Sequence, residues 1–147
     1  MSVQSQSTTV PSTLTIDNLR WQKSSRLSKL MIENFRNYHQ ATLEFNASNV
    51  VLTGLNGVGK TNLLEAISLL APGRGMRRAR REHLPNKLSG KNQWAVAGTL
   101  QVADGDVQVG SGVEADTTQS GRVMRLEGQN VSQTEIGEYI IVSWLTP

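Results

Sequence analysis

The chain has 147 residues, enough for one ordinary folded domain and too few for two cores of comparable size. Hydrophobic residues make up 37% of it, and the absence of cysteine excludes a disulfide scaffold, a thiolate zinc site and a cysteine nucleophile. No run approaches the roughly 20 apolar residues of a membrane helix, and the N-terminus lacks the charged and apolar regions of a signal peptide. We therefore expect a cytoplasmic protein that does not span a membrane.

Positive charge is concentrated in one segment. The formal net charge is only +3, but residues 74–91 carry seven basic side chains and one acidic side chain, Glu82. Residues 92–147 carry two basic and seven acidic side chains. Residues 74–91, called the basic segment below, are thus the part of the chain best suited to attract an anionic partner.

The first third of the chain predicts an extension, a hairpin and a central strand. Residues 1–26 open with a Ser/Thr/Gln tract without apolar periodicity and are interpreted as a disordered or loosely ordered extension, so that the folded domain spans 27–147. Apolar or alternating runs at 30–35 and 41–45, separated by a turn at 37–39, predict two antiparallel strands. The continuous apolar run 50–52 predicts a strand covered on both faces.

The remainder predicts one helix followed by a β-rich region. Apolar residues recur at helical spacing until Pro72-Gly73, at Leu63, Ala66, Ile67 and Leu70. Beyond residue 92 we expect a strand from 94 to 102, a hairpin turn at Asp104-Gly105 and a strand at 123–127. Residues 139–142 predict another buried strand close to the last residue, so the sequence looks cut in mid-domain.

The strongest motif follows the expected strand at 50–52. Gly54-Leu55-Asn56-Gly57-Val58-Gly59-Lys60-Thr61 satisfies G-x-x-x-x-G-K-[ST] between a predicted strand and a predicted helix. Glycines let the backbone curl with its N–H groups inward, and a helix N-terminus adds unpaired N–H groups at the same place. All eight residues are predicted to bind the phosphates of a nucleotide, with Lys60 reaching the β- and γ-phosphates and the Thr61 hydroxyl ligating Mg²⁺. The competing interpretation is a glycine-rich turn with an incidental lysine.

Several segments together resemble one known family. Residues 30–38 (LMIENFRNY), 43–45 (LEF) and 49–67 (NVVLTGLNGVGKTNLLEAI) are similar to the N-terminus of the RecF family of DNA replication and repair proteins. The resemblance continues through 72–80, the strand around Trp94 and residues 142–147, and covers about residues 27–147. It is specific because Asn-Phe-Arg-Asn-Tyr is combined with Lys-Thr-Asn-Leu-Leu-Glu-Ala at the family's spacing.

The resemblance carries implications for fold and function. It implies an α/β P-loop NTPase fold, namely the N-terminal lobe of an ABC-type ATPase head related to the SMC group, with a mixed and antiparallel β-sheet. It also implies ATP and Mg²⁺ as cofactors, an ATP-dependent homodimer in the intact family, and ATP-dependent binding of single-stranded or gapped DNA. Other recombination-mediator proteins are implied partners, and DNA replication, DNA repair and the SOS response to DNA damage are the implied processes.

The chain departs from the family in length and in two motifs. RecF-like proteins are considerably longer, and the sequence contains no run of four apolar residues ending in Asp-Glu, the motif that would hold Mg²⁺ and activate water. Leu88-Ser89-Gly90-Lys91 imitates the LSGGQ-like signature, but it precedes a predicted strand instead of opening a helix far downstream. We therefore expect nucleotide binding with negligible hydrolysis, and we assign no catalytic residue.

Other charged residues are open to two interpretations each. Arg36 and Asn37 resemble residues that lie near the nucleotide in related heads, and a solvated turn is equally consistent. Glu65 is expected at the surface or paired with a basic group. Five arginines could contact DNA phosphates or form a solvated basic face, namely Arg74, Arg77, Arg78, Arg80 and Arg81.

Two alternative functions remain at this stage. One is a non-catalytic, truncated gene product without independent activity, since a cut in mid-domain leaves apolar surface and strand edges exposed. The other is a small P-loop kinase that uses the arginines as a phosphate-clamping lid. A kinase requires strands and helices to alternate after the loop, so the meander expected beyond residue 92 favours the ABC-type head.

Overall fold

The structure is a computed structural model that describes residues 26–115 and 121–145. The predicted extension at 1–26 lies outside the described residues except for Arg26, as do residues 146–147 of the family resemblance. No helix among the described residues is long and apolar enough to cross a membrane.

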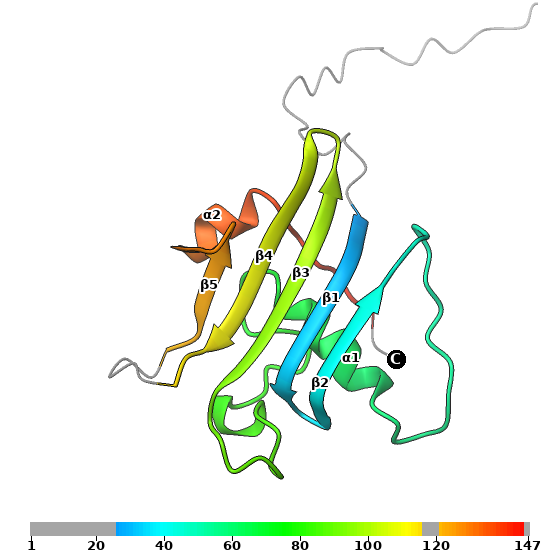
Figure 1. The fold of residues 1–147 in the computed structure, drawn as a ribbon, viewed down its shortest axis with the longest axis vertical. Coiled ribbons are helices and arrows are strands. Elements are labelled where there is room, and N and C mark those ends of the chain that lie inside the picture. Colours follow the sequence, from blue (N-terminus) through cyan, green and yellow to red (C-terminus); the bar gives the residue numbers. More distant parts are fainter. Residues whose placement is uncertain (1–25, 116–120, 146–147) are drawn as a thin grey trace, which may run out of the picture.

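A six-stranded sheet organises the described residues (Figure 1). Its order is β2-β1-β3-β4-β5-β6, and every neighbouring pair is antiparallel. The strands are β1 (Arg26–Phe35), β2 (Tyr38–Glu44), β3 (Trp94–Val102), β4 (Gly105–Val113), β5 (Val123–Leu126) and β6 (Gln129–Val131). Both predicted hairpins are present. Each turn begins one residue earlier than predicted, because Phe35 pairs with Tyr38 and Val102 pairs with Gly105.

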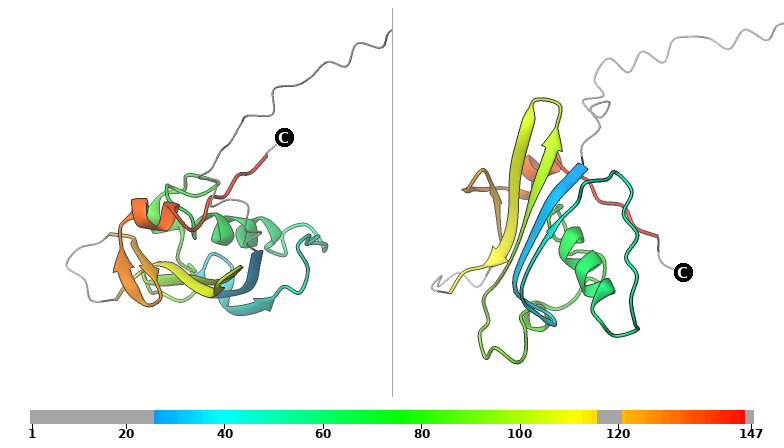
Figure 2. Two further views of the ribbon diagram at one scale, coloured as in Figure 1. Left: turned by 90° about the horizontal axis from the view of Figure 1, so that it is seen from above. Right: turned by 45° about the vertical axis from the view of Figure 1, so that its right-hand side comes forward.

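Two helices lie on the same side of the sheet (Figure 2). The predicted helix is α1 (Lys60–Ser68), and its expected inner face is confirmed: Leu63 and Ala66 are buried and Ile67 is partly buried. A short 3-10 helix, η2 (Arg81–His83), lies within the basic segment. The second α-helix, α2 (Gln133–Gly137), was not predicted.

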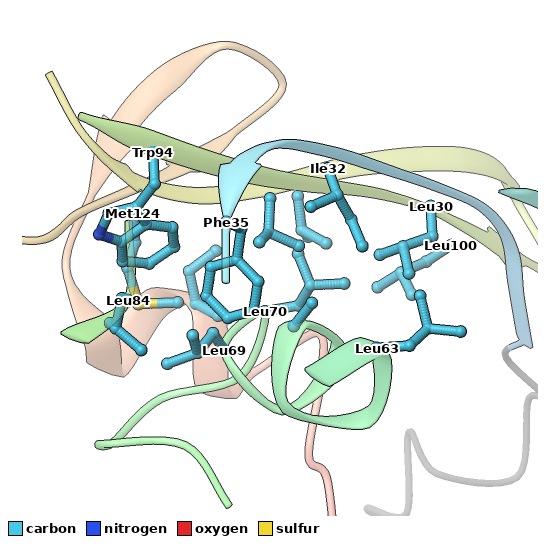
Figure 3. Packing of buried hydrophobic residues seen from close by; sticks show 14 residues of the cluster. Leu30, Ile32, Phe35, Leu63, Leu69, Leu70, Leu84, Trp94, Leu100 and Met124 are labelled. Carbon is cyan, nitrogen blue, oxygen red and sulfur yellow. The ribbon is translucent and has the colours of Figure 1, made fainter. Parts of the chain in front are cut away.

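The core fills the space between the sheet and these helices (Figure 3). Alternate residues of β1 and β3 face inward, and the rings of Phe35 and Trp94 pack with centroids 5.5 Å apart. Gly98 of β3 permits the closest approach, because a Cβ there would lie 2.7 Å from Cδ1 of Leu70. The buried hydrophobic cluster consists of Leu30, Ile32, Phe35, Leu63, Ala66, Leu69, Leu70, Leu84, Trp94, Val96, Leu100, Val109, Met124 and Ile136.

Two predicted strands are wrong. Residues 50–52 and 139–142 form no strand, and Val51 and Ile141 are 84% and 65% exposed. A continuous apolar run becomes a buried strand only where neighbouring strands pair with its backbone and other elements cover its side chains. Within residues 26–115 and 121–145 no strand pairs with either segment.

Candidate nucleotide-binding site

A glycine loop leads directly into α1. Gly54, Gly57 and Gly59 have φ angles of 144°, 84° and 111°, which side-chain-bearing residues rarely adopt. The Leu63 N–H donates to the Gly59 carbonyl at 2.9 Å, so the first backbone hydrogen bond of α1 begins on the last glycine of the loop. The chain thereby bends from the loop into a helix N-terminus, as the motif requires.

Positive charge gathers where the loop meets the helix. Nζ of Lys60 lies 2.7 Å from the Gly54 carbonyl oxygen and 2.8 Å from that of Leu55, so the ammonium group lies against the start of the loop. Thr61 is exposed, and the first turn of α1, all of it described, contains no acidic residue. The helix dipole and the Lys60 charge therefore act together on this loop without a compensating carboxylate in that turn.

The turn between β1 and β2 holds the loop. Nδ2 of Asn37 donates to the Val58 carbonyl at 3.1 Å, and Oδ1 of Asn37 accepts from Nδ2 of Asn62 at 2.8 Å. The Tyr38 hydroxyl donates to the Gly59 carbonyl at 3.1 Å. Asn37 therefore lies beside the predicted phosphate loop and is more than a solvated turn residue.

A buried charge network supports the first part of α1. Glu65 is 1% exposed, and the Arg36 guanidinium donates two hydrogen bonds to its carboxylate, from Nε to Oε2 at 2.8 Å and from Nη2 to Oε1 at 2.7 Å. Nη1 of Arg77 lies 3.5 Å from Oε2 of Glu65 and donates to Oδ1 of Asn62 at 2.9 Å. Of the two alternatives expected for Glu65, the structure confirms the pairing with a basic group.

The five arginines of the basic segment do not act alike. Arg77 reaches back to α1, as described above. Arg80 lies 4.0 Å from the exposed carboxylate of Glu82. Arg74 and Arg81 line a cavity together with Arg122, a residue outside the segment. Contact between these arginines and DNA stays a prediction.

Sequence reasoning missed Arg122, whose hydrogen bonds connect the end of α1 to the sheet. Its guanidinium donates to the Leu69 carbonyl at 2.6 Å, the Ala71 carbonyl at 2.9 Å, the Gly73 carbonyl, and Oγ of Ser111 at 2.6 Å. Burial and, less strongly, the nearby charge of Arg81 together lower the pKa of Arg122 to about 10. The available sequence signal was that Arg122 is one of only two basic residues in the acidic stretch 92–147.

Comparison with known sequences identifies the family. Residues 26–145 match the model of the RecF/RecN/SMC N terminal domain. The DNA replication and repair protein RecF of Agrobacterium fabrum is 43% identical over 122 residues, which cover 82% of this chain and 32% of that protein. RecF of Caulobacter vibrioides is 41% identical over 128 residues, which cover 84% of this chain and 33% of that protein. The chain thus spans about a third of the length of the curated relatives it matches.

Solved structures share the fold. The recombination mediator protein RecF with ATP, of the RecFOR pathway, superposes with a TM-score of 0.70 and 30% identity, over 81% of this chain and 32% of that chain. The SMC head domain from Thermotoga maritima superposes with a TM-score of 0.54 and 19% identity, over 77% of this chain and 41% of that chain. This likeness concerns the fold alone. The predicted fold class is confirmed: the chain belongs to the RecF/RecN/SMC family and folds as the N-terminal lobe of a RecF-type ATPase head.

Proposed function

We propose that this chain is the ATP-binding N-terminal part of a RecF-like DNA replication and repair protein that binds single-stranded or gapped DNA in an ATP-dependent way. The observation that carries the proposal is the glycine loop 54–59, which turns into the N-terminus of α1 beside the Lys60 ammonium group. A RecF structure with ATP is among the similar folds, which supports the choice of nucleotide.

The residues present fit a magnesium-bound triphosphate. Backbone N–H groups from Gly54, Leu55, Asn56, Gly57, Val58 and Gly59 would cradle the phosphates, and Lys60 would add a point charge. Thr61 would give Mg²⁺ one hydroxyl ligand, a sufficient protein share because Mg²⁺ retains water and phosphate oxygens as its other ligands. Bound ATP supplies the transferable γ-phosphoryl group, while the residues of this chain bind and orient it.

The first test is titration calorimetry of Mg-ATP with the whole chain and with Lys60→Ala. We expect Lys60→Ala to abolish measurable binding, because it removes the cation at the phosphates. Lys29→Ala is the matched control, since Lys29 lies in β1 and pairs on the surface with Glu44 at 3.6 Å. Equal affinity of the wild type and Lys60→Ala would overturn the assignment of the loop. Circular dichroism on each sample establishes that the variants are folded.

Negligible hydrolysis is expected from this chain alone. Phosphoryl transfer requires a positioned nucleophile and counter-charge, and neither the acidic strand end nor the helical signature of this ATPase class occurs in the sequence. Residues 88–91 lie in a loop before β3, with Leu88 96% exposed. Phosphate release above background by the purified chain, lost in Lys60→Ala, would contradict this expectation.

DNA binding, dimerisation and partners form the wider part of the proposal. We infer that nucleotide-bound copies dimerise, engage DNA in the cytoplasm and meet other recombination-mediator proteins there. The RecF relatives are DNA replication and repair proteins, and one is a recombination mediator in the RecFOR pathway. Fluorescence anisotropy with single-stranded and gapped oligonucleotides, with and without Mg-ATP, tests the DNA step. Affinity that is unchanged by ATP would count against it.

A second candidate function is a non-catalytic product without independent activity. The observation that favours it is the exposure of large apolar side chains at Val51, Leu55 and Leu145, which are 84%, 85% and 101% exposed. Exposed apolar surface promotes association and aggregation. A chain that aggregates and binds no nucleotide in the calorimetric test would favour this candidate.

A further inference from the structure

A cavity of about 310 Å³ lies at the end of α1, away from the glycine loop. Its described lining comes from the C-terminal end of α1 and residue 73, the basic segment, β3, β4, and the residues just before β5 and at the start of α2, and it includes none of residues 54–61. A volume of this size admits a small ligand.

The charged side chains among the described lining residues are all positive. Arg74, Arg81 and Arg122 all line the cavity, and none of the described residues that line it is acidic. Arg122 donates to backbone carbonyls and to Ser111, and no carboxylate among residues 26–115 and 121–145 forms an ion pair with it. Burial is the main cause of the lowered pKa of Arg122, and repulsion from the Arg81 charge adds to it. A bound anion would relieve this repulsion.

A buried donor is available at the same place. Trp94 is 2% exposed, and its Nε1–H has no hydrogen-bond partner among the described residues. Figure 3 shows this nitrogen on the side of the indole ring that faces away from Phe35. An unpaired buried donor costs free energy unless an acceptor reaches it. Gln133 also lines the cavity, and its Oε1 accepts from the Gly73 N–H at 3.0 Å. This hydrogen bond holds the Gln133 side chain against Gly73, which lines the same cavity.

We propose that this cavity binds a phosphate group, with Arg74 and Arg81 supplying charge and the Trp94 indole N–H donating a hydrogen bond to a phosphate oxygen. Planar guanidinium groups and an N–H donor match the tetrahedral oxygens of phosphate, and they form charge-assisted hydrogen bonds with them. The phosphate is either free or part of a DNA backbone. The site is separate from the ATP site, and only its DNA source rests on the proposed function.

The test uses inorganic phosphate and the full chain in a Lys60→Ala background, where phosphate binding at the glycine loop is removed. Titration calorimetry at constant ionic strength, with chloride replaced by phosphate, is expected to show saturable binding. Arg74→Gln and Trp94→Phe should each weaken it by about tenfold, since each removes one charge-assisted contact. Arg80→Gln is the matched control, because Arg80 belongs to the same segment but does not line the cavity.

The source of the phosphate is distinguished by a parallel titration with a single-stranded oligonucleotide. If Arg74→Gln and Trp94→Phe weaken oligonucleotide and phosphate binding together, while Arg80→Gln does neither, the ligand is a backbone phosphate. If only phosphate binding weakens, the ligand is a free phosphate, and DNA binding stands or falls separately. The proposal is overturned if Arg74→Gln weakens neither phosphate binding nor oligonucleotide binding more than Arg80→Gln does. Arg74 is exposed, so Arg74→Gln stays interpretable even if Trp94→Phe disturbs the core.

Discussion

At the scale of single residues, the carboxylate of Glu65 shows how a buried charge is tolerated. It lies at 1% exposure inside α1, where an unpaired ion would be strongly unfavourable, and the Arg36 guanidinium satisfies both of its oxygens. Nη1 of the same arginine donates to the His83 carbonyl at 2.7 Å. Arg36 therefore joins the β1–β2 turn, the helix behind the glycine loop and the basic segment.

Glu65→Gln should destabilise the fold by about 3 kcal/mol, because it leaves a partly buried arginine without its counter-charge. Urea denaturation followed by circular dichroism measures the change in the free energy of unfolding. Glu44→Gln is the control: Glu44 pairs with Lys29 on the surface, where such pairs contribute about 0.5 kcal/mol. Equal effects of the two substitutions would show that the Arg36–Glu65 pair carries no special stability.

Two glycines of the loop separate backbone strain from side-chain crowding. Both Gly57 and Gly59 have positive φ angles, but a Cβ at Gly57 meets nothing within 4 Å, whereas a Cβ at Gly59 would lie 2.5 Å from Nδ2 of Asn37. Gly59→Ala should therefore weaken Mg-ATP binding at least about tenfold more than Gly57→Ala, because it also displaces the turn that holds the loop. Calorimetry compares the two variants. Recovery of affinity in Gly59→Ala combined with Asn37→Gly would identify crowding as the cause, and equal losses would argue against it.

At the scale of elements, what the sequence predicts depends on how local the signal is. The hairpins, the glycine loop and α1 follow from periodicity and a contiguous motif, so they were predicted with small errors at the turns. The Arg36–Glu65 pair joins residues 29 positions apart, and Arg122 reaches carbonyls about 50 positions away, so no local pattern reveals either. The strand expected at 50–52 failed because burial depends on neighbours that a run of apolar letters does not specify.

The element α2 did carry a local signal that was overlooked. Ser132 accepts from the Glu135 N–H at 3.2 Å, and the Glu135 carboxylate accepts from the Ser132 N–H at 2.8 Å, which together form a capping box. The pattern Ser-x-x-Glu directly before Ile136 indicates a helix start. Ile136 lies within this helix and is fully buried. The cap therefore positions one core residue on a short helix.

The capping box predicts a pH dependence. The Ser132 N–H and, less strongly, the Ser132 hydroxyl hold the pKa of Glu135 below its usual value, because both hydrogen bonds favour the charged carboxylate. A carboxyl whose pKa is lower in the folded state contributes stability above its unfolded pKa and loses it as the pH falls through the folded value. Wild type should thus be more stable than Glu135→Gln near neutral pH and equal to it in strong acid. Urea midpoints measured from neutral pH to strong acid give the difference in stability. Glu138→Gln is the control, because Glu138 is an exposed neighbour of the cap. A constant gap at all pH values would contradict the prediction.

At the scale of the whole molecule, the described residues cover one face of α1 with the sheet and leave apolar surface open on another side. An open cavity of about 1010 Å³ lies between α1, the segment 45–52 and the ends of β1 and β3, and Leu52, Leu64 and Ile67 contribute to its lining. The glycine loop begins at the end of the same exposed segment. Any contact that covers this surface would therefore also restrain segment 50–52, which leads into the loop.

Association through this surface is the last prediction. Val51→Ser should reduce the fluorescence of a bound hydrophobic dye and concentration-dependent association, because Val51 is 84% exposed and lies in the chain between Val50 and Leu52, which both line the open cavity. The free energy of unfolding should hardly change, since an exposed side chain contributes little burial energy. Leu88→Ser is the matched control: Leu88 is 96% exposed but lies in the loop before β3. Sedimentation velocity over a range of concentrations measures association. If Leu88→Ser reduces dye fluorescence and association equally, any exposed apolar residue has the same effect wherever it lies. Segment 50–52 would then have no special role as a contact surface.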